Sequence, residues 1–469
     1  MKTACVILAA GLGKRMHSKL PKVLHTVCGI PMLQSVIDTA RKLKCGKIVV
    51  VAGKHAGLIQ KTIAAADISY ALQEEPKGTG HALLSARNKL RGFTGTLIVL
   101  NGDTPLVNSG TIKKFLSLHR KNRSAVSVLS FVAENPDDYG RIIRDSSGKV
   151  LSITEHKDAD PAQKKIREVN SGVYAINHEL LRLLDAIQMN RKKGEYYLTD
   201  IIALSAERGF QPSALCVGSE QEFMGVNTKP ELFRASRIME EKIIGKWIER
   251  GINVLDEHSV FIHPYAVIGA ETTLYPNVYI DGSTRIGSRV TIYPNVRIRN
   301  SKIEDTAIIK DSTVIEESRV KAGAVVGPFA HLRPGSEVGA DARIGNFVEL
   351  KKTRLGKGSK ASHLSYLGDA RIGSGVNIGA GTITCNYDGE KKSVTVIDAD
   401  VFVGSDSQLI APVRIGRGAY IGAGSTITKD VPSLALAVSR VDQRNIKDWA
   451  KKRRKKGTEL TSGKGRKRN

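Results

Sequence analysis

The sequence predicts two folded parts: an α/β domain with a Rossmann-like, mostly parallel sheet, and then an all-β, left-handed parallel β-helix of hexapeptide repeats. Up to about residue 227, short apolar runs alternate with helical stretches, which is typical of α/β domains. From Ile262 onward, aliphatic residues recur every six positions, which is typical of a β-helix. The length of 469 residues fits two or three domains. We expect an α/β domain over 1–227, a helical linker over 228–251, a β-helix over 252–450 and a disordered basic tail over 451–469.

The first part is predicted to contain buried strands at ACVILAA, KIVVVAG, TLIVLNGD and SAVSVLSFV. Helices are predicted at TGHALLSARNKLRG and SGTIKKFLSLHRKN. Ligands of such sheets bind beyond the carboxyl ends of the strands, so the turns that follow the strands are candidate sites. A connecting helix is expected from Pro230 to about Gly251, because apolar residues fall three or four positions apart there.

The six-residue pattern predicts a triangular coil of short strands, with stacked aliphatic side chains along its axis. The pattern fails at Thr384 and Glu390, where a polar loop from Asn386 to Lys392 leaves it, and it ends at Val431. A loop that leaves a regular scaffold is a candidate active-site element. Two single-residue slips separate the first three runs, and a longer interruption precedes the last run. The matching positions are Ile262, Ile268, Leu274, Ile280, Ile286, Ile292, Ile298, Ile303, Ile309, Ile315, Val320, Val326, Leu332, Val338, Ile344, Leu350, Val403, Leu409, Ile415, Ile421 and Ile427.

The composition indicates an anion-binding protein of a reducing compartment. The formal net charge is +26, of which residues 451–469 contribute ten Lys/Arg minus Glu459, or +9. Such a charge attracts phosphorylated metabolites, nucleotides, coenzyme A or nucleic acid. The five cysteines are scattered without CxxC pairs, which argues against a zinc site or a disulfide framework. No apolar run approaches the roughly 20 residues of a membrane span, and MKTACVILAAGLGKRM is interpreted as a buried strand rather than a secretion signal, so we expect a cytoplasmic protein.

Several residues of the first part point to nucleotide chemistry. The Gly-rich turn LAAGLGKRM follows the first strand and allows backbone NH groups to approach a phosphate, although it is neither a Walker loop nor GxGxxG. Arg15 and Lys22 add cations, which could equally be solvated surface charges. Asp103, at the end of a strand, is placed to hold Mg²⁺ on a phosphate, and Asn227 could be a second ligand. Asp103 is equally compatible with a turn, and Asn227 taken alone would more often be a turn residue.

The repeat part carries its own candidates. His363 is suited to remove a proton from an amine near pH 7, although a lone histidine is more often packed or on the surface. Arg333 and Lys351 could grip a sugar phosphate, or be solvated charges. Cys385 lies in the interrupted stretch but has no His or Asp beside it to activate a thiolate nucleophile.

Taken in order, the motifs LAAGLGKRM, LPKVLH, QEEPKGTGHA, NGDTPL, YGRI, EHKDA and NSGVYA resemble those of sugar-nucleotide pyrophosphorylases. With the repeat part and its NIGAGTITCNYDG stretch, the chain is similar to the family of bifunctional N-acetylglucosamine-1-phosphate uridylyltransferases/glucosamine-1-phosphate N-acetyltransferases. The resemblance covers nearly the whole chain apart from the basic tail. It departs at Asn101, where many relatives are expected to carry an aromatic residue.

For the first part, the resemblance implies uridylyl transfer from UTP to N-acetylglucosamine-1-phosphate, with release of pyrophosphate. Arg15 and Lys22 would neutralise the triphosphate, and Asp103 and Asn227 would hold the Mg²⁺ cofactor. Tyr197 would lie near the sugar. The residues implied to bind the UDP-sugar are Leu8, Ala9, Ala10, Gly11, Lys22, Gln73, Gly78, Thr79, Asn101, Gly102, Asp103, Gly140, Glu155, Asn170 and Asn227.

For the second part, the resemblance implies acetyl transfer from acetyl-CoA to glucosamine-1-phosphate, with His363 as the base. The implied partners are these small-molecule substrates and two further copies of the chain in a homotrimer, with no specific nucleic acid. The implied amino-sugar-phosphate residues are Arg333, Lys351, Tyr366 and Asn377, and the implied acetyl-CoA residues are Ala380, Asn386, Tyr387, Ser405, Ala423 and Arg440.

Two alternatives stay open at this point. A monofunctional pyrophosphorylase with a regulatory β-helix would lack His363, Lys351 and the CNYDG loop as a set, whereas all three are present. A non-catalytic interaction or nucleic-acid-binding protein would explain the charge but not the order of the motifs. The preferred interpretation is an enzyme that makes UDP-N-acetylglucosamine, a precursor of bacterial envelope polymers, in two steps.

Overall fold

The computed structural model describes residues 2–137, 139–190 and 194–454, so most of the predicted basic tail lies outside the described residues. The chain forms two compact units. The first comprises Met1–Arg250 with Phe261–Ala266, and the second comprises Gly251–Val260 with Val267 onward.

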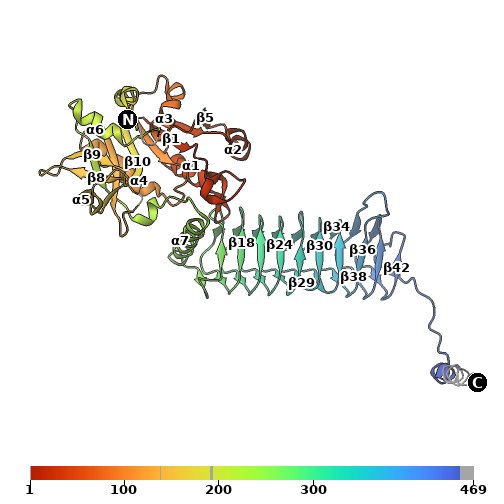
Figure 1. The fold of residues 1–469 in the computed structure, drawn as a ribbon. Helices are drawn as coiled ribbons and strands as arrows, with labels where there is room; N and C mark the ends of the chain where they lie inside the picture. The colour runs from red at the N-terminus through yellow and green to blue at the C-terminus, as the bar shows by residue number, and fades with distance from the viewer. Residues whose placement is uncertain (1, 138, 191–193, 455–469) are drawn as a thin grey trace, which may run out of the picture. The chain divides into compact units, whose positions relative to one another are not determined.

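The first unit is built on a twisted, mostly parallel sheet with the strand order β13-β7-β10-β6-β1-β4-β5 (Figure 1). Strands β1, β4, β5 and β6 run parallel to one another, as do β7 and β13. The predicted strands are confirmed: β1 (Thr3–Ala9), β4 (Lys47–Ala52), β6 (Thr96–Asn101) and β7 (Val126–Val132), joined by β5 (Ile68–Leu72) and β13 (Ser213–Cys216).

Helices cover both faces of this sheet, because the strands are apolar on both sides. One hydrophobic cluster joins alternate β1 residues such as Cys5 and Ile7 to one set of helices, and a second joins Ala4 and Val6 to another. The predicted helices appear as α3 (Thr79–Ser85), continued by a short 3-10 turn, and α4 (Ser109–Lys121). The others are α1 (Met32–Lys42), α2 (Ala56–Thr62), α5 (Pro161–Lys164) and α6 (Asp200–Glu207).

One strand of the sheet is antiparallel. Strand β10 (Glu168–Asn177) runs against both β6 and β7, and its pairing with β7 shifts between Asn170 and Tyr174. A hairpin of β8 (Arg141–Arg144) and β9 (Val150–Thr154) is attached at its edge. This insertion brings the YGRI, EHKDA and NSGVYA motifs to one end of the sheet.

The connecting helix α7 spans Lys229–Ile248 and begins with a capping box in which Thr228 and Glu231 satisfy each other's backbone amides. Pro230 lies in its first turn, as its fixed φ favours. With 20 residues it is the longest described helix, and neither it nor another helix of the described ranges has the length and apolarity needed to cross a bilayer.

The second unit is a left-handed parallel β-helix with three faces. The first face is an 11-stranded sheet from β14 (Asn253–Val254) to β43 (Leu436–Ala437). The second face runs from β18 (Tyr279–Asp281) to β42 (Thr426–Ile427), and the third is a nine-stranded sheet from β16 (Val267–Ile268) to β40 (Val413–Ile415). Every aliphatic residue of the six-residue pattern is buried, with exposed fractions of 5% or less, so the predicted axial stack is confirmed.

The structure corrects the pattern at two places. Thr384 does not leave the stack: it is fully buried beside Leu409, and its hydroxyl accepts a hydrogen bond from the Gly368 amide (2.7 Å). The coil also continues past Val431, because β43 pairs with β41 (Tyr420–Ile421). The first four residues of the predicted disordered tail, 451–454, belong to a helical segment over 449–454.

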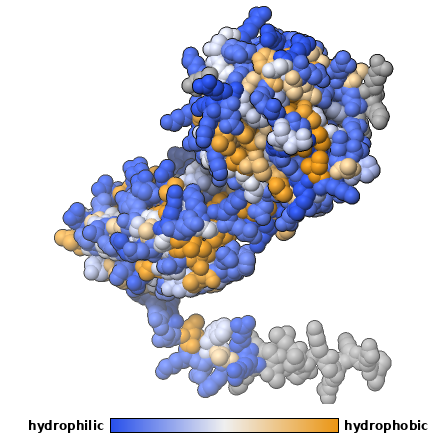
Figure 2. All heavy atoms as spheres, turned by 90° about the vertical axis from the view of Figure 1, so that its left-hand side faces the viewer, coloured by the Kyte–Doolittle hydropathy of each residue, from blue (hydrophilic) through white to orange (hydrophobic). Residues whose placement is uncertain are grey.

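Hydrophilic residues cover most of the face drawn in Figure 2, with smaller hydrophobic areas between them.

Candidate functional site

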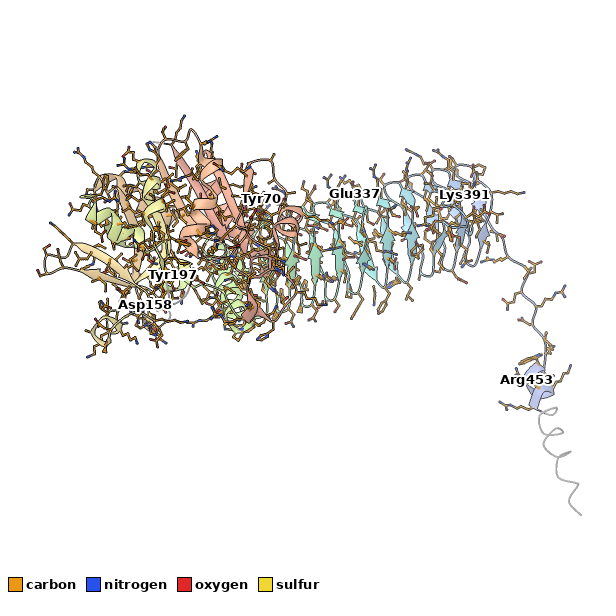
Figure 3. All side chains as sticks on the ribbon, turned by 45° about the horizontal axis from the view of Figure 1, so that its top comes forward. Tyr70, Asp158, Tyr197, Glu337, Lys391 and Arg453 are labelled. Atoms are coloured by element: carbon orange, nitrogen blue, oxygen red, sulfur yellow. The ribbon has the colours of Figure 1, made fainter. Side chains whose placement is uncertain are left out.

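A cavity of about 620 Å³ opens at the carboxyl ends of β1 and β6 in the first unit. It is the place where a parallel sheet is expected to bind its ligand. Tyr197, labelled in Figure 3, and Glu195 also line it. The predicted residues that line this cavity are Leu8, Ala9, Ala10, Gly11, Lys22, Gln73, Gly78, Thr79, Asn101, Asp103 and Glu155.

The Lys22 ammonium joins the two predicted metal ligands. It donates to the Asp103 carboxylate and to the Asn227 amide oxygen (2.9 Å). The two oxygens therefore converge on one cation, although Asp103 and Asn227 are far apart in sequence. Mg²⁺ takes oxygen ligands, commonly one or two from the protein plus substrate phosphates, so this donor set fits the ion.

Two glycines with positive φ shape the loops around this cavity. At Gly13 (φ 63°), a side-chain Cβ would lie 2.6 Å from the Lys22 Cβ, so glycine allows the Gly-rich turn to pass against Lys22. At Gly78 (φ 95°), a Cβ would lie 2.6 Å from the Tyr196 carbonyl oxygen. These close approaches explain why the turns require glycine at these positions.

Gln73 is held rigidly at the cavity wall. It is only 4% exposed, and its amide nitrogen donates to the Gly78 carbonyl (3.0 Å) and lies 3.0 Å from the His81 Nδ1. The adjacent Thr79 hydroxyl accepts from the Leu198 amide (3.0 Å). A carboxamide fixed in this way presents a defined hydrogen-bonding edge to a planar ligand such as a base.

The residues predicted to hold the sugar come together through the β8–β9 insertion. The backbone NH of Asn170 donates to the Gly140 carbonyl (2.8 Å). A Cβ on Gly140 would lie 3.6 Å from a Glu155 carboxylate oxygen. Thr199 donates to Glu155 (3.2 Å). Burial raises the pKa of the Glu155 carboxyl, and nearby acidic groups such as Asp200 add to the effect.

The remaining predicted residues lie beside this cavity. Arg15 and Asn227 line a neighbouring hollow of about 1270 Å³ that also contains Arg234 and Lys157. Gly102 directly follows β6 beside the end of β1, and its amide donates to the Leu8 carbonyl (2.9 Å). Asn101, which lines the cavity itself, contacts Gly172, where a Cβ would lie 2.2 Å from the Asn101 side-chain nitrogen.

In the second unit, predicted residues follow one another along the second face. Arg333 comes directly after β27 (His331–Leu332), Lys351 ends β30 (Glu349–Lys351), and Tyr366 begins β33 (Tyr366–Gly368). These strands are neighbours in register. Arg333 pairs with Glu349 (3.0 Å).

Gly368 forms the floor on which two predicted side chains meet. A Cβ there would lie 2.5 Å from the Tyr366 hydroxyl and 2.8 Å from the Asn386 amide nitrogen. Gly368 is also the register partner of Lys351. A phenol and an amide are thus brought together above a residue without a side chain, on the turn next to Lys351.

A second row of predicted residues stacks along one corner of the coil. His363 lies two residues after Ala361, which pairs with Ile378, and Ile378 pairs in turn with Val403. Val403 pairs with Ile421 on the next turn. The residue two positions after each of these paired residues occupies the same corner of the coil, and these corner residues are His363, Ala380, Ser405 and Ala423. Arg440 reaches this row and donates to the Ala423 carbonyl.

Asn377 does not join the other amino-sugar residues within one chain. It lies in β35 (Asn377–Ile378) on the first face, between Lys360 and Phe402, whereas Arg333, Lys351 and Tyr366 lie on the second face. The predicted amino-sugar residues are therefore divided between two faces, with His363 at the corner between them.

The residues 386–394 form a loop that leaves the coil between β36 (Ile383–Cys385) and β37 (Thr395–Ile397), beside the strands labelled β34 and β36 in Figure 1. Its two arms are held by an antiparallel bridge between Tyr387 and Lys392. Asp388 closes the tip by accepting from the Lys391 amide (2.8 Å). Tyr387 is 59% exposed, and Lys391 is labelled in Figure 3.

Two charged neighbours of this site were not predicted from the sequence. Glu349 pairs with Arg333, and the Lys392 ammonium lies against Lys351, which lowers the Lys392 pKa. Glu349 could have been found from its two-residue distance to Lys351 on the same strand. Burial raises the pKa of the Cys385 thiol, which disfavours the thiolate that a nucleophile needs.

Comparisons with known proteins agree with both units. Residues 5–183 match the MobA-like NTP transferase domain, and residues 265–300 and 395–429 match the bacterial transferase hexapeptide repeat. The chain is 48% identical to the bifunctional protein GlmU of Thermodesulfovibrio yellowstonii over 96% of this chain and 99% of the relative. It is 45% identical to GlmU of Pelobacter propionicus (97% and 99% covered) and 44% identical to GlmU of Heliobacterium modesticaldum (98% and 100%). The chain therefore belongs to the family of bifunctional GlmU proteins.

Proposed function

We propose that the chain makes UDP-N-acetylglucosamine in two reactions. Acetyl-CoA and glucosamine-1-phosphate give N-acetylglucosamine-1-phosphate and free coenzyme A, and UTP then gives UDP-N-acetylglucosamine and pyrophosphate. The observation that carries the proposal is that one chain combines a nucleotidyltransferase unit with a hexapeptide coil that is interrupted at the predicted acetyl site. Family membership over nearly the full length favours this over a monofunctional enzyme with a regulatory coil.

In the first unit, we propose that the glycine turn and Gln73 bind the uridine nucleotide, with Glu155 and Asn170 on the sugar. Lys22 and Arg15 would neutralise the phosphates, so that a sugar-phosphate oxygen can attack the α-phosphorus in line and expel pyrophosphate. Mg²⁺ held by Asp103 and Asn227 would supply further charge neutralisation. The convergence of both oxygens on Lys22 supports this assignment.

In the second unit, we propose that Arg333 and Lys351 hold the phosphate of glucosamine-1-phosphate, with Tyr366 and Asn377 on the sugar. His363 would accept a proton from the amine as the amine nitrogen attacks the thioester carbon. The C–S bond then breaks to release coenzyme A as a thiolate, which takes up the proton from the protonated His363. The corner row would form the coenzyme groove, with Asn386 and Tyr387 at its reacting end. The oxyanion would be stabilised by polar groups already in place.

We propose a homotrimer in the cytoplasm. The division of the amino-sugar residues between two faces supports a site completed by a neighbouring copy. An exposed apolar row at the same corner, Phe329 (50%), Phe347 (55%) and Leu364 (62%), supports it too, because such patches are commonly covered. Scattered cysteines fit a reducing compartment. Light scattering checks the trimer; a monomer at micromolar concentration contradicts it.

A product assay tests the two-step proposal directly. Acetyl-CoA with glucosamine-1-phosphate should release a free thiol, and UTP with N-acetylglucosamine-1-phosphate should release pyrophosphate when Mg²⁺ is present. Absence of thiol release with intact pyrophosphate release would favour the monofunctional alternative. A chelator should stop the second reaction and leave the first unchanged.

A further inference from the structure

We infer that Asp369 is the positioning residue that holds the 386–394 loop, and with it Asn386, in place for acetyl transfer. Asp369 follows β33 at a corner of the coil, where its backbone is left-handed (φ 47°). Its amide donates to the Lys351 carbonyl (2.8 Å), which ties the corner to the preceding turn. The inference rests on the acetyl transfer proposed above for this site.

Asp369 contacts both ends of the loop. Its carboxylate accepts a hydrogen bond from the Asn386 amide nitrogen, at the first residue of the loop. Its backbone carbonyl accepts from the Thr395 amide (3.3 Å), directly after the last residue. A loop that departs from a regular coil is thus closed at its base by one residue.

The carboxylate also fixes which way the Asn386 side chain points. A carboxylate only accepts hydrogen bonds, so the NH₂ end of the amide must face Asp369. The amide oxygen is then the end left for a reactant N–H, such as the sugar amine or an amide of the coenzyme. Asn386 is only 7% exposed, so it has little room to turn over.

The negative charge has a second effect on the loop. Lys392, on the returning arm, lies against Lys351, and the repulsion between the two ammonium groups lowers the pKa of Lys392. Asp369 opposes this shift. It thereby keeps two cations close together where a sugar phosphate would bind, and a phosphate would complete the neutralisation.

Kinetics of two variants at this corner test the inference. Asp369→Gly removes the carboxylate without straining a left-handed backbone, and Asp369→Asn keeps an acceptor. For Asp369→Gly we expect kcat for acetyl transfer to fall about 10- to 100-fold, as small misplacements do, while KM for glucosamine-1-phosphate changes less. The kcat of Asp369→Asn for acetyl transfer should lie between the values of Asp369→Gly and the parent. Asp400→Gly, at another left-handed corner (φ 62°), is the matched control and should keep kcat.

Hydrogen exchange gives a readout that does not need activity. Amides of residues 386–394 should exchange faster in Asp369→Gly than in the parent and in Asp400→Gly. Asn386→Asp should also loosen the loop, because it places two carboxylates together, and adding Asp369→Asn should restore protection. Unchanged exchange and kcat in Asp369→Gly, or no restoration in the double variant, would overturn the inference. A parent protein without thiol release would instead refute the proposed function, and exchange would still decide the anchor.

Discussion

Asp103 is the single residue on which we expect uridylyl transfer to depend most clearly. Asp103→Ala removes one of the two oxygens that converge on Lys22 and leaves that ammonium with Asn227 alone. We expect pyrophosphate release to fall by at least about 100-fold, since charge neutralisation dominates phosphoryl chemistry. Thiol release from acetyl-CoA, measured on the same preparation, should be unchanged. Loss of both activities in a folded protein would contradict two independent centres.

His363 should give the opposite result. His363→Ala removes the imidazole from the corner row beside Ala380 and leaves the axial stack intact, because the stack residue of that strand is Ala361. We expect thiol release to fall about 100- to 10,000-fold, the usual contribution of a general base. His363→Gln is the matched variant that keeps size and polarity and should be equally impaired. Substantial acetyl transfer by either variant would exclude His363 as the base.

Glu155 links the sugar site to pH-dependent stability. Burial raises its folded pKa above the unfolded value, so the folded state binds the proton more tightly. Its favourable contribution is therefore present below the unfolded pKa of about 4.3 and is lost as pH rises through the folded pKa. Glu155→Gln should raise Tm relative to the parent more at pH 8 than at pH 4, while weakening uridylyl transfer.

Calorimetry at the two pH values measures this difference. Asp145→Asn is the matched control of opposite sign, because hydrogen bonds from Ser147 and the backbone lower the pKa of Asp145. Its stabilising contribution is present above the unfolded pKa, so Asp145→Asn should lower Tm more at pH 8 than at pH 4. A Tm difference for Glu155→Gln that does not grow with pH would contradict the account.

At the residue scale, the sequence could predict which residue types were needed but not how the coil brings them together. Gly11 and Asp103 were recognisable because each follows a strand of the strand-helix pattern, whereas Gly78 was implied by the family resemblance, and all three line one cavity. Lys392 was not, because its nearness to Lys351 depends on how the 386–394 loop folds back. The division of Asn377 from Tyr366 also depends on the three-faced register, which residue spacing alone does not give.

At the element scale, the interrupted turn of the coil has a polar residue, Thr384, at a buried position that is aliphatic on other turns. The Thr384 hydroxyl accepts a hydrogen bond from the buried Gly368 amide and donates one to the Gly368 carbonyl (3.0 Å). Thr384→Val would restore the aliphatic pattern yet leave that amide without its partner. We expect a loss of about 1–3 kcal/mol in the free energy of unfolding, the cost of an unsatisfied buried group. Denaturant unfolding of both proteins measures it.

Ile378→Val is the control for this experiment, since it removes one methylene group from the same stack and should cost only about 0.5–1.5 kcal/mol. A Thr384→Val protein more stable than its parent would show that hydrophobic fit outweighs the hydrogen bond. The turn would then be interrupted for the loop alone, with no structural demand for a hydroxyl.

The strong six-residue periodicity made the coil predictable from the sequence. Elements without a clear periodicity, such as β43 and β10, were not predicted. The six-residue pattern identified the buried stack because each turn repeats the same burial. Strand β43 was missed because its inward position is the small Ala437, which gives little aliphatic signal. The antiparallel direction of β10 was missed as well, since an apolar run does not reveal strand polarity.

At the scale of the whole molecule, the two compact units predict separable activities. A fragment of residues 1–266 should catalyse uridylyl transfer without acetyl transfer, because the cavity and its lining residues lie in the first unit. This fragment should also be more stable than 1–250. Phe261–Ala266 belongs to the same compact unit, Tyr265 donates to Asp38 (2.6 Å), and His263 packs against Gly29.

Thermal unfolding of the two fragments, with pyrophosphate release at equal concentration, measures this difference. Tyr265→Phe in the 1–266 fragment is the matched control: it keeps the ring and removes the hydroxyl bond, so its Tm should lie between those of the two fragments. If 1–266 and 1–250 melted together, the segment 261–266 would contribute nothing to the first unit. If neither fragment released pyrophosphate while the full chain did, the nucleotide reaction would require the coil, and the picture of two independent centres would fail.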